Sequence, residues 1–255
     1  MIRSGNNRGW LYFHAMGELL TLDLEHKVTR VRQFLAASVR THGRVIYANS
    51  LGPEAMVLTD IIASHLPEIE IFSIDTGRLP EQTHELLARL EERYGPRIRL
   101  VYPDAQALQS LTAAVGVNGF RKNLAARLSC CEVRKIEPFK RAIAGFSAWI
   151  TGVRREHSAT RAQGLTEEWD AQYGLYKLSP LLEWTQEQTW QYIRARRLPY
   201  NALHDAQYPS IGCAPCTRAI QPGEHQRAGR WWWEESASRE CGLHPRVRHA
   251  AVAVV

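Results

Sequence analysis

Strands that alternate with helices constrain the fold of this 255-residue chain more than any other feature. Short apolar runs with the length of buried strands lie at 44–50, 70–74, 97–101 and 148–152, and helical patterns separate them. A fifth run, at 173–178, can extend the same sheet. Strands joined by helices pair in parallel, so we predict an α/β fold with a doubly wound, mostly parallel sheet.

The flanking segments divide the chain further. Residues 1–42 have apolar side chains at helical spacing and form a predicted N-terminal helical segment. Helices are also predicted at 55–65, at 80–94 with Pro80 in the first turn, and at 185–196 with Thr185 as the N-cap. The pattern becomes irregular from about residue 199. We therefore expect an α/β domain over 43–220 and a C-terminal arm over 221–255.

Polar and glycine-containing segments follow three of the predicted strands. In open α/β sheets, ligands bind beyond the carboxyl ends of the strands. The segments Ser50-Leu51-Gly52, Asp75-Thr76-Gly77 and 152–155 all fall there. We therefore predict a ligand site at this edge of the sheet.

Four of the five cysteines have the pattern of a metal centre. Cys130 and Cys131 are adjacent, and Cys213 and Cys216 form a C-x-x-C pair. Thiolates bind zinc or iron–sulfur clusters. Adjacent cysteines diverge and hold a single small ion poorly, whereas a cluster offers each thiolate its own iron atom. The pattern thus favours a [4Fe–4S] cluster over zinc and over buried thiols without a metal.

Cys241 stands apart from this set. Its neighbours Glu240, Gly242 and His244 are poor material for a core. A nearby imidazolium lowers the pKa of a thiol and raises the fraction of thiolate. We predict that Cys241 is a nucleophile, with a buried inert thiol as the alternative. The Trp231-Trp232-Trp233 run upstream is interpreted as packing rather than base stacking.

The charge of the chain favours an anionic partner. The net charge is +6 and the pI is about 9.2. Arginine binds phosphate or sulfate through a planar fork, although any single arginine can equally be a solvated surface residue. The basic residues near predicted loops are Lys135, Arg154, Arg155, Arg161, Arg218, Arg227 and Arg230. No apolar run approaches the roughly 20 residues of a membrane span, and the N-terminus lacks a signal-peptide pattern, so we expect a cytoplasmic protein.

Several motifs together resemble one family. They are Ile74–Pro80, Cys130–Lys135, Ile150–Arg155, Ser210–Arg218, Gly229–Glu235 and Glu240-Cys241-Gly242-Leu243-His244. In this order, across about residues 45–244, the chain resembles the bacterial assimilatory adenylylsulfate (APS) reductases. These form the iron–sulfur branch of the APS/PAPS reductase family, where PAPS is 3′-phosphoadenylyl sulfate.

The resemblance implies a fold and a reaction. The fold would be that of the adenine nucleotide alpha-hydrolases. The enzyme would reduce adenylyl sulfate to sulfite and AMP in sulfate assimilation and cysteine biosynthesis. The Cys241 thiolate would attack the sulfur, and thioredoxin or a glutaredoxin would release sulfite from the resulting S-sulfocysteine. One [4Fe–4S] cluster per subunit, bound by Cys130, Cys131, Cys213 and Cys216, would organise the site without passing electrons. The family also suggests a homo-oligomer.

The resemblance also implies which residues bind the substrate. Ser50, Leu51 and Gly52 would form a modified phosphate loop. The other implied contacts are Asp75, Thr76 and Gly77 in the nucleotide pocket, Arg161 in a basic loop, and Lys135, Arg154, Arg227, Arg230 and His244. The loop departs from the family pattern at two positions, since Pro53 and Ala55 replace an alanine and an acid.

Other functions remain open at this point. The substrate can be PAPS, or both nucleotides, although the four cysteines favour adenylyl sulfate. An ATP-dependent, iron–sulfur tRNA-thiolating enzyme of the same fold would require a Ser-Gly-Gly-x-Asp-Ser loop, which residues 50–55 do not match. A non-enzymatic metal-binding regulator is the third alternative.

Overall fold

The sheet has the predicted mostly parallel form. The computed structural model describes residues 8–157, 164–235 and 243, with side chains from residue 22 onward. Within this part of the chain, six strands form one sheet in the order β3-β2-β1-β4-β6-β5. The strands are β1 (Val45–Ala48), β2 (Glu70–Ile74), β3 (Ile98–Val101), β4 (Ala148–Ile150), β5 (Glu167–Asp170) and β6 (Leu175–Leu178). All neighbours pair in parallel except β5 and β6.

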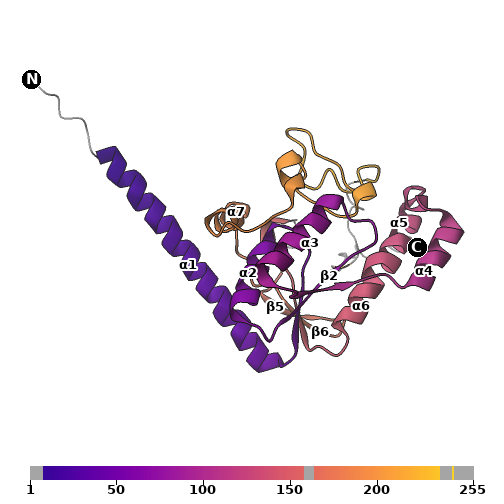
Figure 1. Cartoon of the computed structure of the whole chain (residues 1–255), viewed down its shortest axis with the longest axis horizontal. Helices are drawn as coiled ribbons and strands as arrows, with labels where there is room; N and C mark the ends of the chain where they lie inside the picture. The colour runs from indigo at the N-terminus through magenta and orange to yellow at the C-terminus, as the bar shows by residue number, and fades with distance from the viewer. Residues whose placement is uncertain (1–7, 158–163, 236–242, 244–255) are drawn as a thin grey trace, which may run out of the picture.

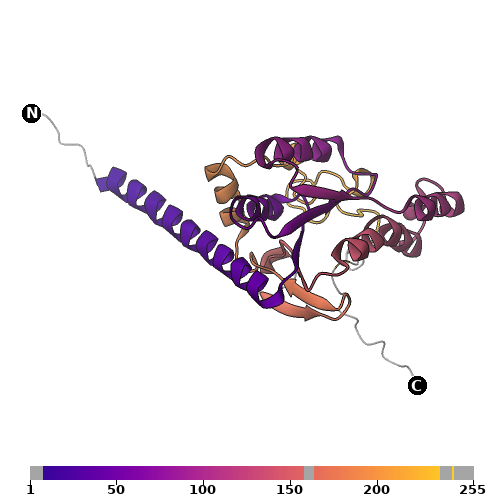
Figure 2. The same cartoon turned by 60° about the horizontal axis from the view of Figure 1, so that its bottom comes forward.

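Helices cover the sheet as Figure 1 shows. They are α1 (Arg8–His42), α2 (Pro53–His65), α3 (Glu81–Tyr94), α4 (Ala105–Val115), α5 (Leu124–Cys131), α6 (Glu137–Ile143) and α7 (Gln186–Ala195). A π-helical turn, Glu132–Ile136, joins α5 to α6. The N-terminal part of α1 projects away from the remaining elements in both Figure 1 and Figure 2.

Most of the predicted elements are confirmed, with three differences. Thr185 caps α7 through a full capping box with Gln188, as its sequence context indicates. Pro80 is the N-cap of α3 and not part of its first turn. The sequence patterns also do not predict α4 or the edge strand β5. The residues of β5 are Glu167-Glu168-Trp169-Asp170, which lack an apolar pattern because the strand pairs on one side only.

Alternating strand residues supply two cores, one on each face of the sheet. Val45 and Tyr47 pack with residues of α1, α2, α3 and α7. Ile46, between them, packs on the opposite face with Phe139 of α6 and Trp149 of β4. This period of two is the property of a strand that is buried on both faces.

The strand order reverses direction between β1 and β4. The chain runs outward from β1 through β2 to β3, then returns to place β4 on the other side of β1. In a doubly wound sheet, this reversal opens a crevice at the carboxyl ends of the two strands. The segments at residues 50–52 and 151–154 border that crevice.

Candidate active site

A cavity of about 800 Å³ opens at the carboxyl edge of the sheet. Its walls include most of the predicted site residues: Ser50, Leu51, Gly52, Thr76, Lys135, Arg154, Arg227, Arg230 and the cysteines 130, 131, 213 and 216. Residues far apart in the sequence thus share one space. Three predicted site residues, Arg161, Cys241 and His244, lie outside the described part of the chain.

Asp75 and Gly77 are not among the described residues that line the cavity. Asp75 Oδ1 accepts a hydrogen bond from the Gly77 N–H at 2.8 Å, and Asp75 Oδ2 lies 3.0 Å from His84 Nε2. Gly77 has a φ of 68°, a conformation that favours glycine. Asp75 therefore holds the turn beside Thr76, and its direct contact with a nucleotide stays a prediction.

Asn49 fixes the loop after β1 where it lines the cavity. Asn49 Oδ1 accepts the Leu51 N–H at 2.8 Å and Asn49 Nδ2 donates to Thr59 Oγ1 at 2.9 Å, which holds Leu51 at a φ of 59°. Pro53 occupies the first turn of α2, where a fixed φ is favourable and no N–H is required. The departure at Pro53 thus fits the start of a helix whose N-terminus can bind an anion. Sequence reasoning missed Asn49, although asparagine two residues before a turn is an available signal.

Arg154 reaches the cavity from the loop after β4, but two carboxylates bind its guanidinium. Arg154 Nε donates to Glu54 Oε1 at 2.7 Å, and Nη1 donates to Glu156 Oε2 at 2.6 Å. The side chain is 3% exposed. Glu54 therefore offsets the positive charge of Arg154 beside the phosphate loop. The partners of Arg154 in the structure are Glu54 and Glu156, and a contact between Arg154 and the substrate stays a prediction.

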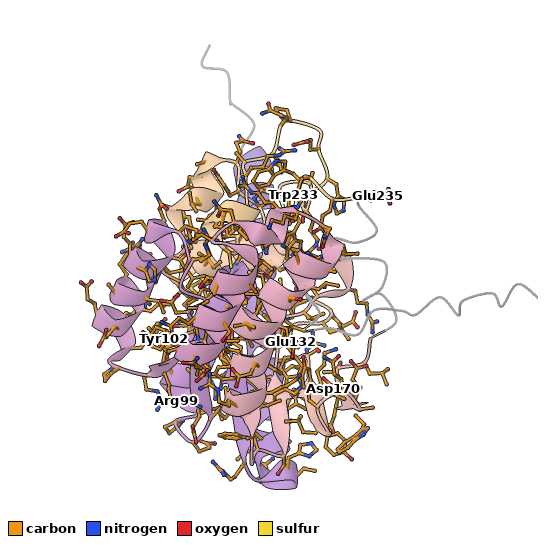
Figure 3. The ribbon with its side chains drawn as sticks, turned by 90° about the vertical axis from the view of Figure 1, so that its right-hand side faces the viewer. Arg99, Tyr102, Glu132, Asp170, Trp233 and Glu235 are labelled. Carbon is orange, nitrogen blue, oxygen red and sulfur yellow. The ribbon has the colours of Figure 1, made fainter. Side chains whose placement is uncertain are left out.

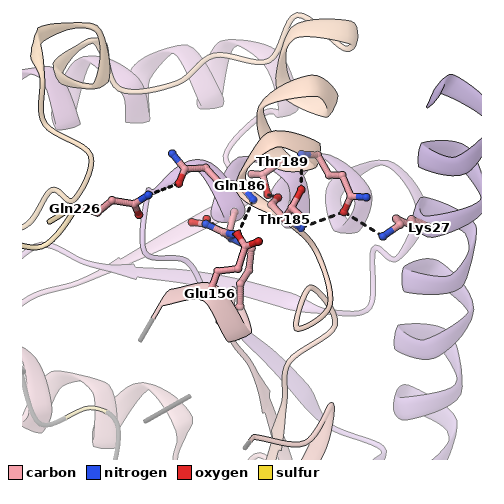
Figure 4. Close-up of polar contacts among 9 residues, drawn as sticks. Lys27, Glu156, Thr185, Gln186, Thr189 and Gln226 are labelled. Carbon is pink, nitrogen blue, oxygen red and sulfur yellow. Dashed lines mark hydrogen bonds and ion pairs between the residues drawn. The ribbon is translucent and has the colours of Figure 1, made fainter. Parts of the chain in front are cut away.

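Glu156 also connects the loop after β4 to Gln186 and, through Gln186, to Gln226 (Figure 4). Glu156 Oε2 also accepts the Gln186 N–H at the start of α7, at 3.0 Å. Gln186 Oε1 accepts a hydrogen bond from Gln226 Nε2 at 2.5 Å. Gln226 directly precedes Arg227, so this network sets the position of a predicted substrate contact.

Replacing Arg154 with methionine should lower the free energy of unfolding by about 3 kcal/mol, because it leaves the carboxylate of Glu54 buried without its partner. The matched control is Arg155→Met, which breaks a more exposed ion pair with Glu183 and should cost less than about 1 kcal/mol. Urea denaturation of both variants measures the difference. Equal losses would show that the burial of the Arg154 pair has no energetic consequence.

The four described cysteines converge from two distant segments. Cys130 and Cys131 end α5, Cys213 is the N-cap of a short helical turn, and Cys216 is its last residue. They pack together against Phe120, Trp231 and Trp233. Burial, reinforced by the neighbouring thiols, raises the pKa of Cys216 to about 12. Burial also raises the pKa of Cys130, which Arg134 opposes. The thiols of Cys130 and Cys216 therefore stay protonated near neutral pH unless a metal binds them.

The surroundings of these thiols fit an anionic cluster. No group of three or more His, Cys, Asp or Glu side chains in the described residues is preformed as a metal-ion site. The four thiols nevertheless share one pocket that is rich in donors. Thr76 Oγ1 lies 3.2 Å from Cys213 Sγ, the Arg134 guanidinium lowers the pKa of the neighbouring Cys130 thiol, and the buried Trp231 Nε1 has no hydrogen-bond partner. This donor set fits four thiolates around an iron–sulfur cluster.

Arg230 lies between the C-x-x-C segment and the cavity. Its Nη1 donates to the Ile211 carbonyl oxygen at 3.0 Å, and its guanidinium lies 4.6 Å above the Trp231 ring. A Cβ atom at Gly212 would collide with the Arg230 guanidinium, so a larger residue there would force this guanidinium to move. Arg230 is 9% exposed, which leaves it partly sheltered from water at the cavity wall.

Leu243 is the one described residue near Cys241 on its C-terminal side. It lines the cavity and packs against the core cluster of Phe72, Phe139 and Trp149. Sequence reasoning also missed Arg127 and His204, which line the cavity as well. Burial lowers the pKa of His204. Neither residue belongs to a sequence motif that would have identified it.

Comparison with known proteins gives a consistent result. The family described as "Phosphoadenosine phosphosulfate reductase domain" matches residues 44–219. The adenosine 5′-phosphosulfate reductase of Allochromatium vinosum is 50% identical over 214 residues, which cover 84% of each chain. The enzyme of the same name from Burkholderia cepacia is 46% identical over 230 residues, covering 90% of this chain and 92% of the relative.

Solved structures confirm the fold. A phosphoadenylyl-sulfate reductase from Candida auris superposes with a TM-score of 0.64 at 24% identity, covering 77% of this chain and 96% of that one. An FMN adenylyltransferase from Candida glabrata gives a TM-score of 0.55 at 13% identity, covering 81% and 70%. The chain therefore has the adenine nucleotide alpha-hydrolase-like fold predicted above.

Proposed function

The chain belongs to the family of the phosphoadenosine phosphosulfate reductase domain, and from this premise we propose that it reduces adenylyl sulfate to sulfite and AMP in sulfate assimilation. One observation carries the proposal. A single cavity brings together the phosphate loop after β1, four cysteines, and the arginines Arg227 and Arg230. The family match over 44–219 supports the bounds of a domain at 43–220. This domain would bind the nucleotide and the cluster, and the arm over 221–255 would contain the catalytic cysteine.

The substrate phosphate would bind at the N-terminus of α2. There the first turn of α2 would direct its backbone N–H groups toward the anion, and Pro53 presets the helix. Lys135, Arg227 and Arg230 line the same cavity and would bind the sulfonyl and phosphate oxygens. These contacts place positive charge where negative charge develops in the transition state.

Cys130, Cys131, Cys213 and Cys216 would hold one [4Fe–4S] cluster per subunit. When bound, the cluster would order the cysteine-containing wall and contribute to its electrostatic potential, without carrying the electrons of the reaction. Thr76, Arg134 and Trp231 would donate hydrogen bonds toward its sulfur atoms, as their positions around the four thiols suggest.

Cys241 would act as the nucleophile in two balanced steps. Its thiolate attacks the sulfur of adenylyl sulfate, an S–S bond forms, and the S–O bond to the phosphate breaks, so that AMP leaves with the electron pair. A thioredoxin or glutaredoxin thiolate then attacks Cys241 Sγ, and sulfite departs with the electron pair of the S–S bond. A second thiol of the reductant resolves the mixed disulfide, which restores Cys241 and oxidises the dithiol.

The position of Leu243 supports this role. It lines the cavity as the second residue after Cys241, and two residues of chain span at most about 7 Å. A thiol tethered so closely to the cavity wall can reach a nucleotide bound there.

The partners and compartment are part of the same proposal. No described helix has the combined length and apolar character needed to cross a membrane. The four described cysteines are free thiols. Free thiols suit a reducing cytoplasm, where thioredoxin or glutaredoxin is available. A homo-oligomer is proposed from the family resemblance alone.

Trapping the intermediate tests the function. Anaerobically purified protein, incubated with adenylyl sulfate and no thiol protein, should gain one sulfonate group on the peptide that contains Cys241, as measured by mass spectrometry. A comparison of kcat/KM for adenylyl sulfate and PAPS, with thioredoxin present, then decides the substrate. A higher value for PAPS, or equal values, would support the alternative of PAPS or dual use. Protein that retains its iron and forms no adduct with either nucleotide would contradict the proposal.

A further inference from the structure

One buried ion pair connects α5 to the segment just before Cys241. Arg127 Nε donates to Glu234 Oε1 at 2.9 Å, and Arg127 Nη2 donates to Glu234 Oε2 at 2.8 Å. We infer that this pair is a clasp that seats the C-terminal arm against the four-cysteine wall, which makes Arg127 and Glu234 positioning residues for Cys241. The inference rests on the proposed function, because it assigns the clasp to the proposed nucleophile.

The burial of the pair is the first argument. The side chains are 0% and 7% exposed, so both charges are removed from water. Desolvation of a buried pair offsets much of its attraction, and such a pair contributes little net stability compared with apolar residues. Its two parallel hydrogen bonds instead permit one relative orientation of the guanidinium and the carboxylate. This fixed orientation of Arg127 and Glu234 is useful at the base of an arm whose position matters for the chemistry.

The other contacts of Arg127 lie at the cysteine wall. Arg127 is four residues before Cys131 on α5, which places both on one helix face, and its guanidinium interacts electrostatically with the Cys131 side chain. Its guanidinium also lies 4.7 Å above the Trp231 ring. One side chain therefore contacts a proposed cluster ligand, an aromatic residue of the same pocket and the carboxylate at the base of the arm.

Glu234 is fixed to the same wall from its own side. The Glu234 N–H donates to the Trp231 carbonyl oxygen at 2.8 Å, and the Trp231 N–H donates to the Cys216 carbonyl oxygen at 3.1 Å. Figure 3 shows Trp233 and Glu235, which flank Glu234 in the chain, on the same face of the molecule as Glu132, which directly follows Cys131.

The stretch that contains Cys241 is thus bounded by two attachments. It begins after Glu234, which Arg127 holds, and it reaches Leu243, which packs at the cavity. Loss of the first attachment should free the arm while leaving the sheet and the phosphate loop intact. This consequence separates a positioning role from a general contribution to stability.

The test uses Glu234→Gln and Arg127→Lys in the full-length, anaerobically purified protein. Glu137→Gln is the matched control, because Glu137 also binds an arginine through two hydrogen bonds, but on the exposed surface of α6. The first readout is the rate at which iodoacetamide alkylates Cys241 in the presence of AMP, followed by mass spectrometry. We expect both clasp variants to react at least about fivefold faster than wild type, and the control to react at the wild-type rate.

The second readout is kinetic. The rate of Cys241 sulfonation should fall at least about tenfold in both clasp variants, with little change in KM, because a displaced nucleophile still leaves the nucleotide site intact. If Glu234→Gln loses iron or unfolds, it is replaced by Glu234→Asp. This variant keeps the negative charge but has a shorter side chain toward Arg127. Wild-type alkylation and sulfonation rates in the clasp variants would overturn the inference. Should the wild-type protein form no adduct, the proposed function fails, and the alkylation rates still decide whether the clasp exists.

Discussion

Cys241→Ser should reduce sulfite release at least about 10³-fold, because a serine hydroxyl stays protonated near neutral pH and is a far weaker nucleophile than a thiolate. The same variant should form no sulfonated peptide when it is incubated with adenylyl sulfate. Sulfite release with thioredoxin and mass spectrometry without it measure the two effects separately.

The variant must otherwise resemble the wild type for this result to be informative. Cys130, Cys131, Cys213 and Cys216 share the pocket beside Phe120 and Trp231 and are the proposed cluster ligands, whereas Cys241 is the proposed nucleophile. Iron content and AMP affinity should therefore be unchanged in Cys241→Ser. Sulfite release at the wild-type rate would assign the nucleophile to another group, and a loss of iron would place Cys241 among the ligands.

Cys216→Ala should reduce the iron content from about four atoms per chain to less than about one, because a cubane cluster requires all four thiolates. Cys216 is the most buried of the four described cysteines, at 8% exposure. In Cys216→Ala, a water molecule therefore cannot take the place of the missing thiolate without opening the core. Metal analysis and the visible absorbance of anaerobically purified protein measure the loss.

The same experiment separates the cluster from its alternatives. Burial raises the pKa of the Cys216 thiol to about 12, so this thiol is protonated in the metal-free pocket, and cluster assembly must release its proton. Apparent iron incorporation should accordingly weaken as the pH falls. Wild-type protein that contains zinc and no iron, or a Cys216→Ala variant that keeps its full iron content, would contradict the assignment. Cys241→Ser serves as the control, since it removes a cysteine outside the ligand set.

Local physical chemistry accounts for the elements that sequence reasoning predicted correctly. The strand Val45–Ala48 follows from a short apolar run, and the start of α7 follows from Thr185 and Gln188, whose capping contacts reach only three residues. β5 was missed because an edge strand needs neither an apolar face nor alternating apolar and polar residues. Its polar residues adopt the strand conformation through antiparallel pairing with β6.

The candidate site was predictable where residue type alone indicates chemistry. Adjacent cysteines, a C-x-x-C pair and a loop that ends a strand are visible without coordinates, and the structure places them at one cavity. The partners of Arg154 were not predictable in this way. Glu54 lies 100 residues away in the chain, and only the parallel pairing of β1 with β4 brings the two loops together.

The sequence by itself determined the alternation of strands and helices, the pairs of cysteines and the polar setting of Cys241, because each depends on neighbours a few residues apart. The tertiary structure alone decided the strand order, the meeting of Cys130 and Cys131 with Cys213 and Cys216, and the ion pair between Arg127 and Glu234, 107 residues apart. Such contacts depend on how the whole chain buries its apolar surface, and no local pattern records which distant charge a buried arginine will meet.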